Sequence, residues 1–185
     1  MNIFEFLMIL LSLIVGLGVT EILSGIARIL KRDGIRGFGW THGAAGLAVF
    51  FALLQMFWES WGLRTVETWS FLAMLTMLGG PIFLYLMSHM LFPASEEPAR
   101  VEDYYFERAR LLWPLDGCTL GVATLFRPIA FGDPLWVLDN VSAIPILAVC
   151  GLLSVAISRM LHRVLVPLVL GSVLLDTLTF SHSIA

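Results

Sequence analysis

Charged side chains are scarce in this sequence. Only 14% of its 185 residues are Asp, Glu, Lys or Arg, whereas 58% are hydrophobic and the mean hydropathy is +0.89. A soluble globular domain carries about 25% charged and about 45–50% apolar residues. The composition therefore excludes a disordered chain and an ordinary soluble domain, and it indicates an integral membrane protein.

Cysteine and the motifs of enzyme chemistry are equally sparse. The two cysteines, Cys118 and Cys150, lie in apolar segments, which excludes a secreted disulfide scaffold. The sequence has no nucleophile elbow, phosphate-binding loop or zinc-protease signature, so we do not expect an enzyme. A net charge of −3, without tracts of Lys or Arg, argues against a nucleic-acid partner.

The histidines do not form a recognisable metal motif. No two of them are four residues apart, as two ligands on one helix face would be, so no metal site and no other cofactor is predicted. His42, His89 and His162 are expected near the same side of the membrane. Bis-histidine haem therefore remains a less favoured alternative.

Long apolar runs are what the sequence has in abundance. A helical span needs roughly 20 apolar residues, and these runs do not alternate with the period of two that barrel strands require. We predict an all-α, polytopic membrane helix bundle that forms a single domain over residues 1–185. Its six transmembrane helices are expected at about 3–30, 40–63, 69–92, 111–131, 135–158 and 164–180.

The distribution of Lys and Arg predicts the orientation of the bundle. Nine of the eleven follow spans one, three and five: Arg28, Lys31, Arg32, Arg36, Arg100, Arg108, Arg110, Arg159 and Arg163. Only Arg64 and Arg127 lie on the other side. Because basic loops stay in the cytoplasm, we expect these three loops inside and both termini outside. The first run lacks the basic n-region of a signal peptide, so it is expected to be a retained span.

Ionisable residues inside the predicted spans are the candidate functional residues, because a charge in the bilayer core is costly. One group is a candidate intramembrane polar path, made of Glu21, His89, Asp116 and Asp176. A second is a candidate outer-side polar cluster, made of Glu59, Arg127 and Asp139. Arg127 is expected to pair with Glu59, Asp139 or Asp176. Both groups could instead be internal bracing, or interfacial residues that reach water.

Two further segments carry specific expectations. Gly79, Gly80 and Pro81 lie near the middle of span three and form a candidate hinge, because proline removes a backbone donor and glycine weakens a helix. We expect a kink or a local break there. The polar stretch 94–110 is expected to contain a short helix that lies on the membrane or extends span four inward. A solvated surface is favoured there over a docking site.

Several short segments resemble a known group of proteins. These are residues 16–25 (GLGVTEILSG), 57–58 with 61–64 (FW and WGLR), 80–82 (GPI) and 104–107 (YYFE). They are similar to segments of small, uncharacterised bacterial inner-membrane proteins. The resemblance covers spans one to three and the following loop. It implies a bacterial inner-membrane location and no particular activity.

Two classes of function fit these observations. The first is a small proton- or ion-coupled transporter or channel. Its expected partners are the lipid bilayer and further copies of the chain. The alternative is a non-catalytic accessory or assembly subunit of a larger membrane complex, which would explain the small loops and the absence of motifs. A haem- or quinone-binding redox subunit is less favoured.

Overall fold

The computed structural model describes residues 3–66, 68–93, 100–136, 138–156 and 158–180. Within these ranges the chain forms six α-helices and no strand, which confirms the all-α prediction. The helices are α1 (Ile3–Asp33), α2 (Trp40–Glu59), α3 (Phe71–Leu91), α4 (Val101–Phe131), α5 (Leu138–Val155) and α6 (Arg159–Phe180). Two 3-10 turns, Gly34–Gly37 and Ser60–Thr65, follow α1 and α2.

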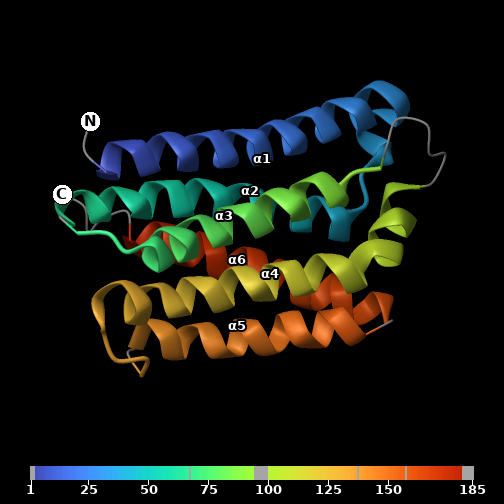
Figure 1. The fold of residues 1–185 in the computed structure, drawn as a ribbon. Coiled ribbons are helices and arrows are strands. Elements are labelled where there is room, and N and C mark those ends of the chain that lie inside the picture. The colour runs from blue at the N-terminus through green and yellow to red at the C-terminus, as the bar shows by residue number, and fades with distance from the viewer. Residues whose placement is uncertain (1–2, 67, 94–99, 137, 157, 181–185) are drawn as a thin grey trace.

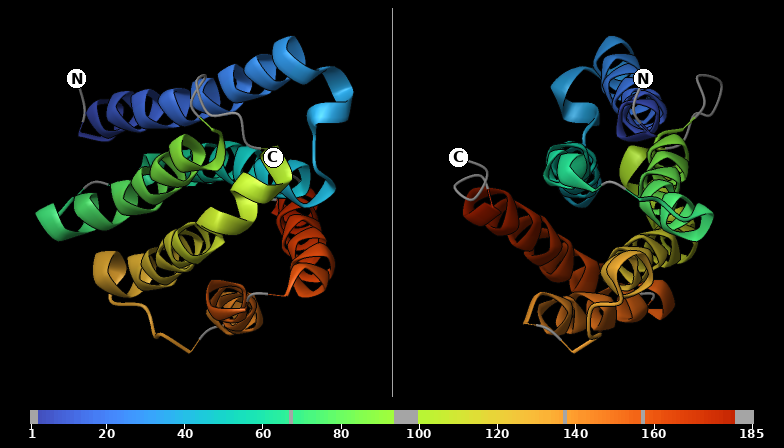
Figure 2. Two further views of the ribbon diagram at one scale, coloured as in Figure 1. Left: turned by 90° about the vertical axis from the view of Figure 1, so that its right-hand side faces the viewer. Right: turned by 60° about the vertical axis from the view of Figure 1, so that its left-hand side comes forward.

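In the view of Figure 1 the six helices run across the picture beside one another, and Figure 2 shows that they cross at angles, with α6 strongly tilted against α1 and α2. Their main contacts form a ring in the order α1, α3, α4, α5, α6 and α2, and α2 closes the ring against α1. Both views of Figure 2 place α1 and α5 on opposite sides of the bundle. Helix α1 begins at the end of the molecule at which α6 finishes (Figure 1).

Four of the six helices are long and apolar enough to cross a membrane. They are α1, α2 with its following turn (Trp40–Thr65), α3 and the Arg159–Leu178 part of α6. In α5 the apolar part, Ala143–Val155, is shorter. Helix α4 lies between α3 and α5 and contacts both of them.

Helix α4 begins earlier than predicted. The expected span started at residue 111, whereas the helix starts at Val101 and continues without interruption to Phe131. Glu102 and Asp103 lie in its first turn, where acidic side chains interact favourably with the positive end of the helix dipole. The described part of the stretch 94–110, from Val101 onward, is therefore a helix continuous with the predicted fourth span.

The glycines of the candidate hinge lie at close contacts between helices. Helix α3 is continuous through Pro81, so the local break that we considered does not occur. A Cβ atom on Gly79 would lie 3.1 Å from Val122 of α4. At Gly80 it would overlap the Met56 side chain of α2. The glycines thus let α3 approach both neighbours, which explains their presence without a hinge.

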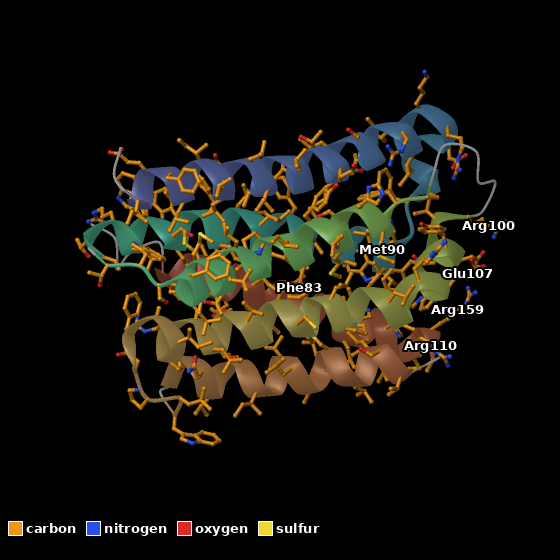
Figure 3. All side chains as sticks on the ribbon, viewed as in Figure 1. Phe83, Met90, Arg100, Glu107, Arg110 and Arg159 are labelled. Atoms are coloured by element: carbon orange, nitrogen blue, oxygen red, sulfur yellow. The ribbon has the colours of Figure 1, made fainter. Side chains whose placement is uncertain are left out.

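Basic side chains gather at one end of the bundle. Arg100, Arg110 and Arg159 lie there together, at the end opposite the two termini (Figures 1 and 3). Two different segments of the chain supply them, residues 100–110 and the start of α6. We refer to this end as the basic end.

Candidate functional site

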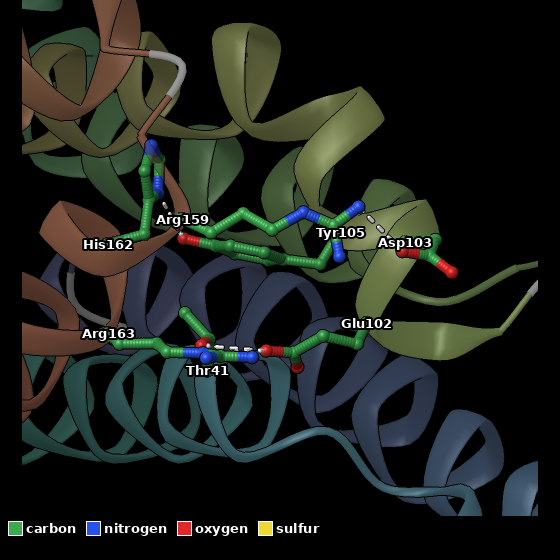
Figure 4. A network of polar contacts seen from close by, with 7 residues as sticks. All are labelled: Thr41, Glu102, Asp103, Tyr105, Arg159, His162 and Arg163. Carbon is green, nitrogen blue, oxygen red and sulfur yellow. Dashed lines mark hydrogen bonds and ion pairs between the residues drawn. The ribbon is translucent and has the colours of Figure 1, made fainter.

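A network of polar contacts joins α2, α4 and α6 at the basic end (Figure 4). The Glu102 carboxyl lies at its centre. Its Oε1 atom accepts a hydrogen bond of 2.9 Å from the Thr41 hydroxyl and lies 3.9 Å from Arg163 Nε. Thr41 is fully buried, so this hydrogen bond is shielded from water. One carboxyl from α4 therefore holds the first turns of two other helices.

A second ion pair lies beside it. Arg159, the first residue of α6, donates to the Asp103 carboxylate at 2.8 Å. The Arg159 guanidinium also lies over the Phe106 ring, 4.9 Å from its centre. Both side chains of the ion pair are about half exposed, so the charge attraction alone contributes little, and the aromatic contact adds to it.

A buried hydrogen-bond chain runs beneath these ion pairs. The indole of Trp113 donates to the Tyr105 oxygen at 3.0 Å, and that oxygen lies 2.9 Å from His162 Nδ1. His162 Nε2 lies 3.2 Å from the Ala156 carbonyl oxygen. A carbonyl can only accept, so Nε2 carries the proton and Nδ1 accepts the Tyr105 hydroxyl proton. Trp113, Tyr105 and His162 are each no more than 1% exposed.

The chemistry of the three side chains determines which group donates and which accepts in each of these hydrogen bonds. Indole can only donate, and burial raises the pKa of the Tyr105 phenol, so the hydroxyl stays protonated. Every donor in the chain therefore has an acceptor. The arrangement locks α6 onto α4, and it leaves neither ring nitrogen of His162 free to bind a haem iron or a metal ion.

The structure brings two members of the candidate polar path together. Glu21 Oε1 of α1 lies 3.2 Å from His89 Nδ1 of α3. The Glu21 side chain is 30% exposed and that of His89 is 62% exposed. This pair therefore lies on the outer surface of the bundle, between α1 and α3, and does not line its interior.

The other two members lie elsewhere. The Cys150 thiol of α5 donates to Asp116 Oδ2 of α4 at 3.2 Å, so Asp116 belongs to the α4–α5 contact. Asp176 lies on α6, which packs mainly on α2. Among the described contacts, the structure joins Glu21 to His89 and Asp116 to Cys150, so these two acids lie at different helix contacts.

The candidate outer-side cluster is rearranged in a similar way. Arg127 forms an ion pair with Asp133 at 2.8 Å, an acid that was not among its three predicted partners. The reason is local, since Gly132 ends α4 with a φ of 71° and turns the chain so that Asp133 comes back beside Arg127. Glu59 accepts a hydrogen bond from Gln55 at 2.7 Å. The Asp139 side chain lies outside the described part of the structure.

Glu59 and Arg127 nevertheless border the same small cavity. It has a volume of about 230 Å³ and lies between α2, α3 and α4 at the end opposite the basic end. Ser60 and Thr76 also line it. The two charged residues are thus neighbours at one depression without a direct ion pair between them.

The residues of the network at the basic end were not among the sequence candidates. Sequence reasoning assigned Glu102, Asp103 and Tyr105 to a polar surface stretch, and it treated His162 only as an unpromising haem ligand. One signal was available. A helix-period reading places Tyr105 eight residues before Trp113, and therefore nearly on the same face of a continuous helix. An aromatic residue with a polar tip usually finds a partner when it is buried.

The sequence and the fold were compared with protein-family models, with curated proteins and with solved structures, and none of them matches.

Proposed function

We propose that the chain is a multi-pass protein of the bacterial inner membrane, with six spans, the basic end in the cytoplasm and both termini outside. The four apolar helices support a membrane location. The clustering of arginines at one end supports the orientation.

Within this frame, we propose that the protein is a non-catalytic subunit that assembles with another membrane protein through the outer face of α1. The observation that carries this proposal is a stripe of small residues on that face. Ser12, Gly16, Thr20, Ser24 and Ala27 are all exposed, and no atom of another part of the chain lies within 4 Å of a Cβ built on Gly16. Small residues at this spacing let helices approach closely in lipid.

The same helix uses its opposite face inside the bundle. Gly18 and Gly25 are buried there, against Leu53 and Phe92 respectively. Helix α1 thus carries two small-residue faces, and the chain itself fills only one of them. The exposed Glu21–His89 pair lies on the flank of the unfilled face, which supports a protein neighbour there, because lipid tails are poor surroundings for ionisable groups.

Transport was the other class of function that the sequence favoured. A polar path would require its residues to lie near one another, whereas Glu21 and Asp116 lie at different helix contacts. The geometry therefore gives more support to the subunit than to the transporter, which stays a prediction from the sequence.

The proposal is tested by native mass spectrometry of the protein extracted from its own membrane in mild detergent. We expect additional chains of a defined mass to accompany it. The variant Gly16→Leu should lose them, because the larger side chain fills the stripe without meeting any atom of its own bundle.

Gly171→Leu is the matched control, since Gly171 is an exposed glycine of α6 that also has nothing within 4 Å of its Cβ position. It should keep the additional chains. A particle that contains only copies of this chain would contradict the subunit role and return attention to transport. Equal loss in both variants would contradict the assignment of the face.

A further inference from the structure

An apolar cavity of about 680 Å³ lies between α1 and α2, on the side of α1 away from the Glu21–His89 pair. It extends along α2 from Gly39 to Phe50, a distance of about 16 Å at the rise of an α-helix. Phe92 and Leu170 contribute to its wall from other parts of the bundle. Its volume is within the range of small-molecule sites, which is about 300–1,000 Å³.

One ring nitrogen of His42, in the wall of this cavity, lacks a hydrogen-bond partner among the described residues. His42 is 1% exposed, and its Nε2 atom lies 3.0 Å from the Leu91 carbonyl oxygen. Since a carbonyl only accepts, Nε2 carries the proton, and in the neutral ring Nδ1 is left as an acceptor. This Nδ1 atom is buried and has no hydrogen-bond donor among the described residues.

A second acceptor without a partner lies close to the same cavity. Glu102 Oε2 is buried and accepts no hydrogen bond within the described part of the chain, although Oε1 of the same carboxyl is bonded to Thr41. Gly39, which lines the cavity, lies directly against this carboxyl, and a Cβ atom there would overlap it. Buried acceptors without donors are rare in folded proteins.

These two atoms define the chemistry of an occupant. Both are acceptors, so the occupant must donate hydrogen bonds. The cavity wall contains neither Lys nor Arg among the described residues, so nothing there would bind the phosphate of a lipid headgroup. A neutral head that bears hydroxyl groups, attached to an apolar tail, fits these requirements.

The aromatic side chains that line the cavity favour an occupant with a planar ring. Phe38, Trp40, Phe50 and Phe92 all line the cavity, and the His42 ring meets that of Phe92 edge-on at 4.9 Å. Aromatic side chains favour stacked or edge-to-face contacts with another planar ring. Of these rings, Phe92 contacts the His42 ring directly, so the lining favours an occupant with a planar ring.

We propose that this cavity binds an isoprenoid hydroquinone. Its tail lies in the apolar channel, its ring lies among the aromatic side chains, and a ring hydroxyl donates to His42 Nδ1, with Glu102 as a second acceptor nearby. The oxidised quinone has carbonyl oxygens in place of the hydroxyls, so it cannot donate to either atom. The site therefore distinguishes the two forms and prefers the reduced one.

The test uses the purified full-length protein in mild detergent and a benzohydroquinone with a ten-carbon alkyl tail. Binding is measured by isothermal titration calorimetry under anaerobic conditions, for this compound and for its oxidised form. We expect saturable binding at one site, with the hydroquinone bound about tenfold or more tightly than the quinone, which is the order of effect of one buried acceptor left unpaired.

Two variants connect this binding to the cavity. His42→Phe keeps an aromatic ring and removes the acceptor, so the affinity for the hydroquinone should fall about tenfold and the preference over the quinone should shrink. Gly43→Leu should abolish binding of both forms, because Gly43 lines the cavity and faces open space. Gly121→Leu, at a glycine of α4 that also faces open space but does not line the cavity, should bind as the unaltered protein does.

Equal affinity for the two redox forms, or no saturable binding, would overturn the proposal. Displacement of the hydroquinone by phosphatidylethanolamine in mixed micelles would replace it with a lipid site. The two proposals are tested separately, because Gly16→Leu tests the subunit role by native mass spectrometry, whereas His42→Phe and Gly43→Leu test this cavity by hydroquinone binding.

Discussion

Two buried side chains form their hydrogen bonds to the same oxygen atom, that of the Tyr105 hydroxyl. It accepts from the Trp113 indole and donates to His162 Nδ1, and all three side chains are withdrawn from water. Neither neighbour has another partner in the described structure that could replace this hydroxyl at the same atom. A single oxygen atom therefore satisfies both buried groups at this contact between α4 and α6.

Tyr105→Phe should consequently destabilise the protein well beyond the loss of one ordinary hydrogen bond. The substitution leaves a buried donor and a buried acceptor unpaired, each at a cost of about 1–3 kcal/mol. We expect the free energy of unfolding, measured by SDS titration in detergent micelles, to fall by about 2–4 kcal/mol.

Tyr85→Phe provides the comparison at another tyrosine. The Tyr85 ring lies beside His89, and its hydroxyl makes no hydrogen bond to the rest of the described structure. It should change the unfolding free energy by less than about 0.5 kcal/mol. Similar losses for the two variants would show that the hydroxyl chain does not hold the helices together.

At the scale of the element, α1 shows how one helix uses glycine in two ways. Gly25 lies against the Phe92 ring, which leaves no room for a Cβ atom, whereas Gly16 faces open space. Alanine is favoured over glycine within a helix by about 1 kcal/mol. The same substitution is therefore expected to act with opposite sign at two positions nine residues apart.

Gly25→Ala should lower the thermal stability of the detergent-solubilised protein, because overpacking costs about 1–3 kcal/mol and exceeds the gain in helix propensity. Gly16→Ala should raise it slightly, by up to about 1 kcal/mol. Both are measured by the midpoint of thermal unfolding under identical conditions. Stabilisation by both changes would mean that the Phe92 ring moves aside freely.

The sequence predicted the helices better than it predicted the polar partners. The sequence predicted all six helices, four of which are long and apolar enough to cross a membrane, and their bounds differ from the predicted ones by a few residues except at the start of α4. Partners depend on which helices become neighbours, and this order is not encoded in any one run. The Glu21–His89 contact agreed with the prediction, whereas Asp116 lies against Cys150, which no spacing rule connects to it.

Local turns also bring together side chains that the sequence did not predict to be partners. Asp133 is six residues after Arg127 and was absent from the predicted cluster, yet the left-handed conformation of Gly132 brings the two side chains together. Glu102 was similarly read as solvated because its neighbours in the sequence are polar. Its burial follows from the contact with Gly39 and Thr41, more than sixty residues earlier in the chain.

The two ends of the whole molecule differ in the residues that they carry. The basic end carries the arginine cluster and the polar network, and the opposite end carries the termini (Figures 1 and 3). An exposed residue at each end, Lys31 after α1 and Thr65 after α2, gives access to the two sides of the membrane.

The proposed orientation predicts the reactivity of single cysteines placed at these positions. Cys118→Ala and Cys150→Ser remove the native thiols, and the serine retains a donor for Asp116. In intact spheroplasts, an impermeant maleimide should label Thr65→Cys at once and Lys31→Cys only after lysis. The reverse pattern would invert the proposed orientation.

The position of α4 between α3 and α5 has a consequence for how the protein is made. In the proposed membrane arrangement, a weakly apolar helix is poorly accommodated by lipid during the interval when it has emerged and α5 has not. Helix α3 is already present at that stage and contacts α4, with Gly79 allowing close approach to Val122. We therefore expect insertion of α4 to be coupled to its neighbours, so that the placement of the least apolar helix depends on the order of synthesis.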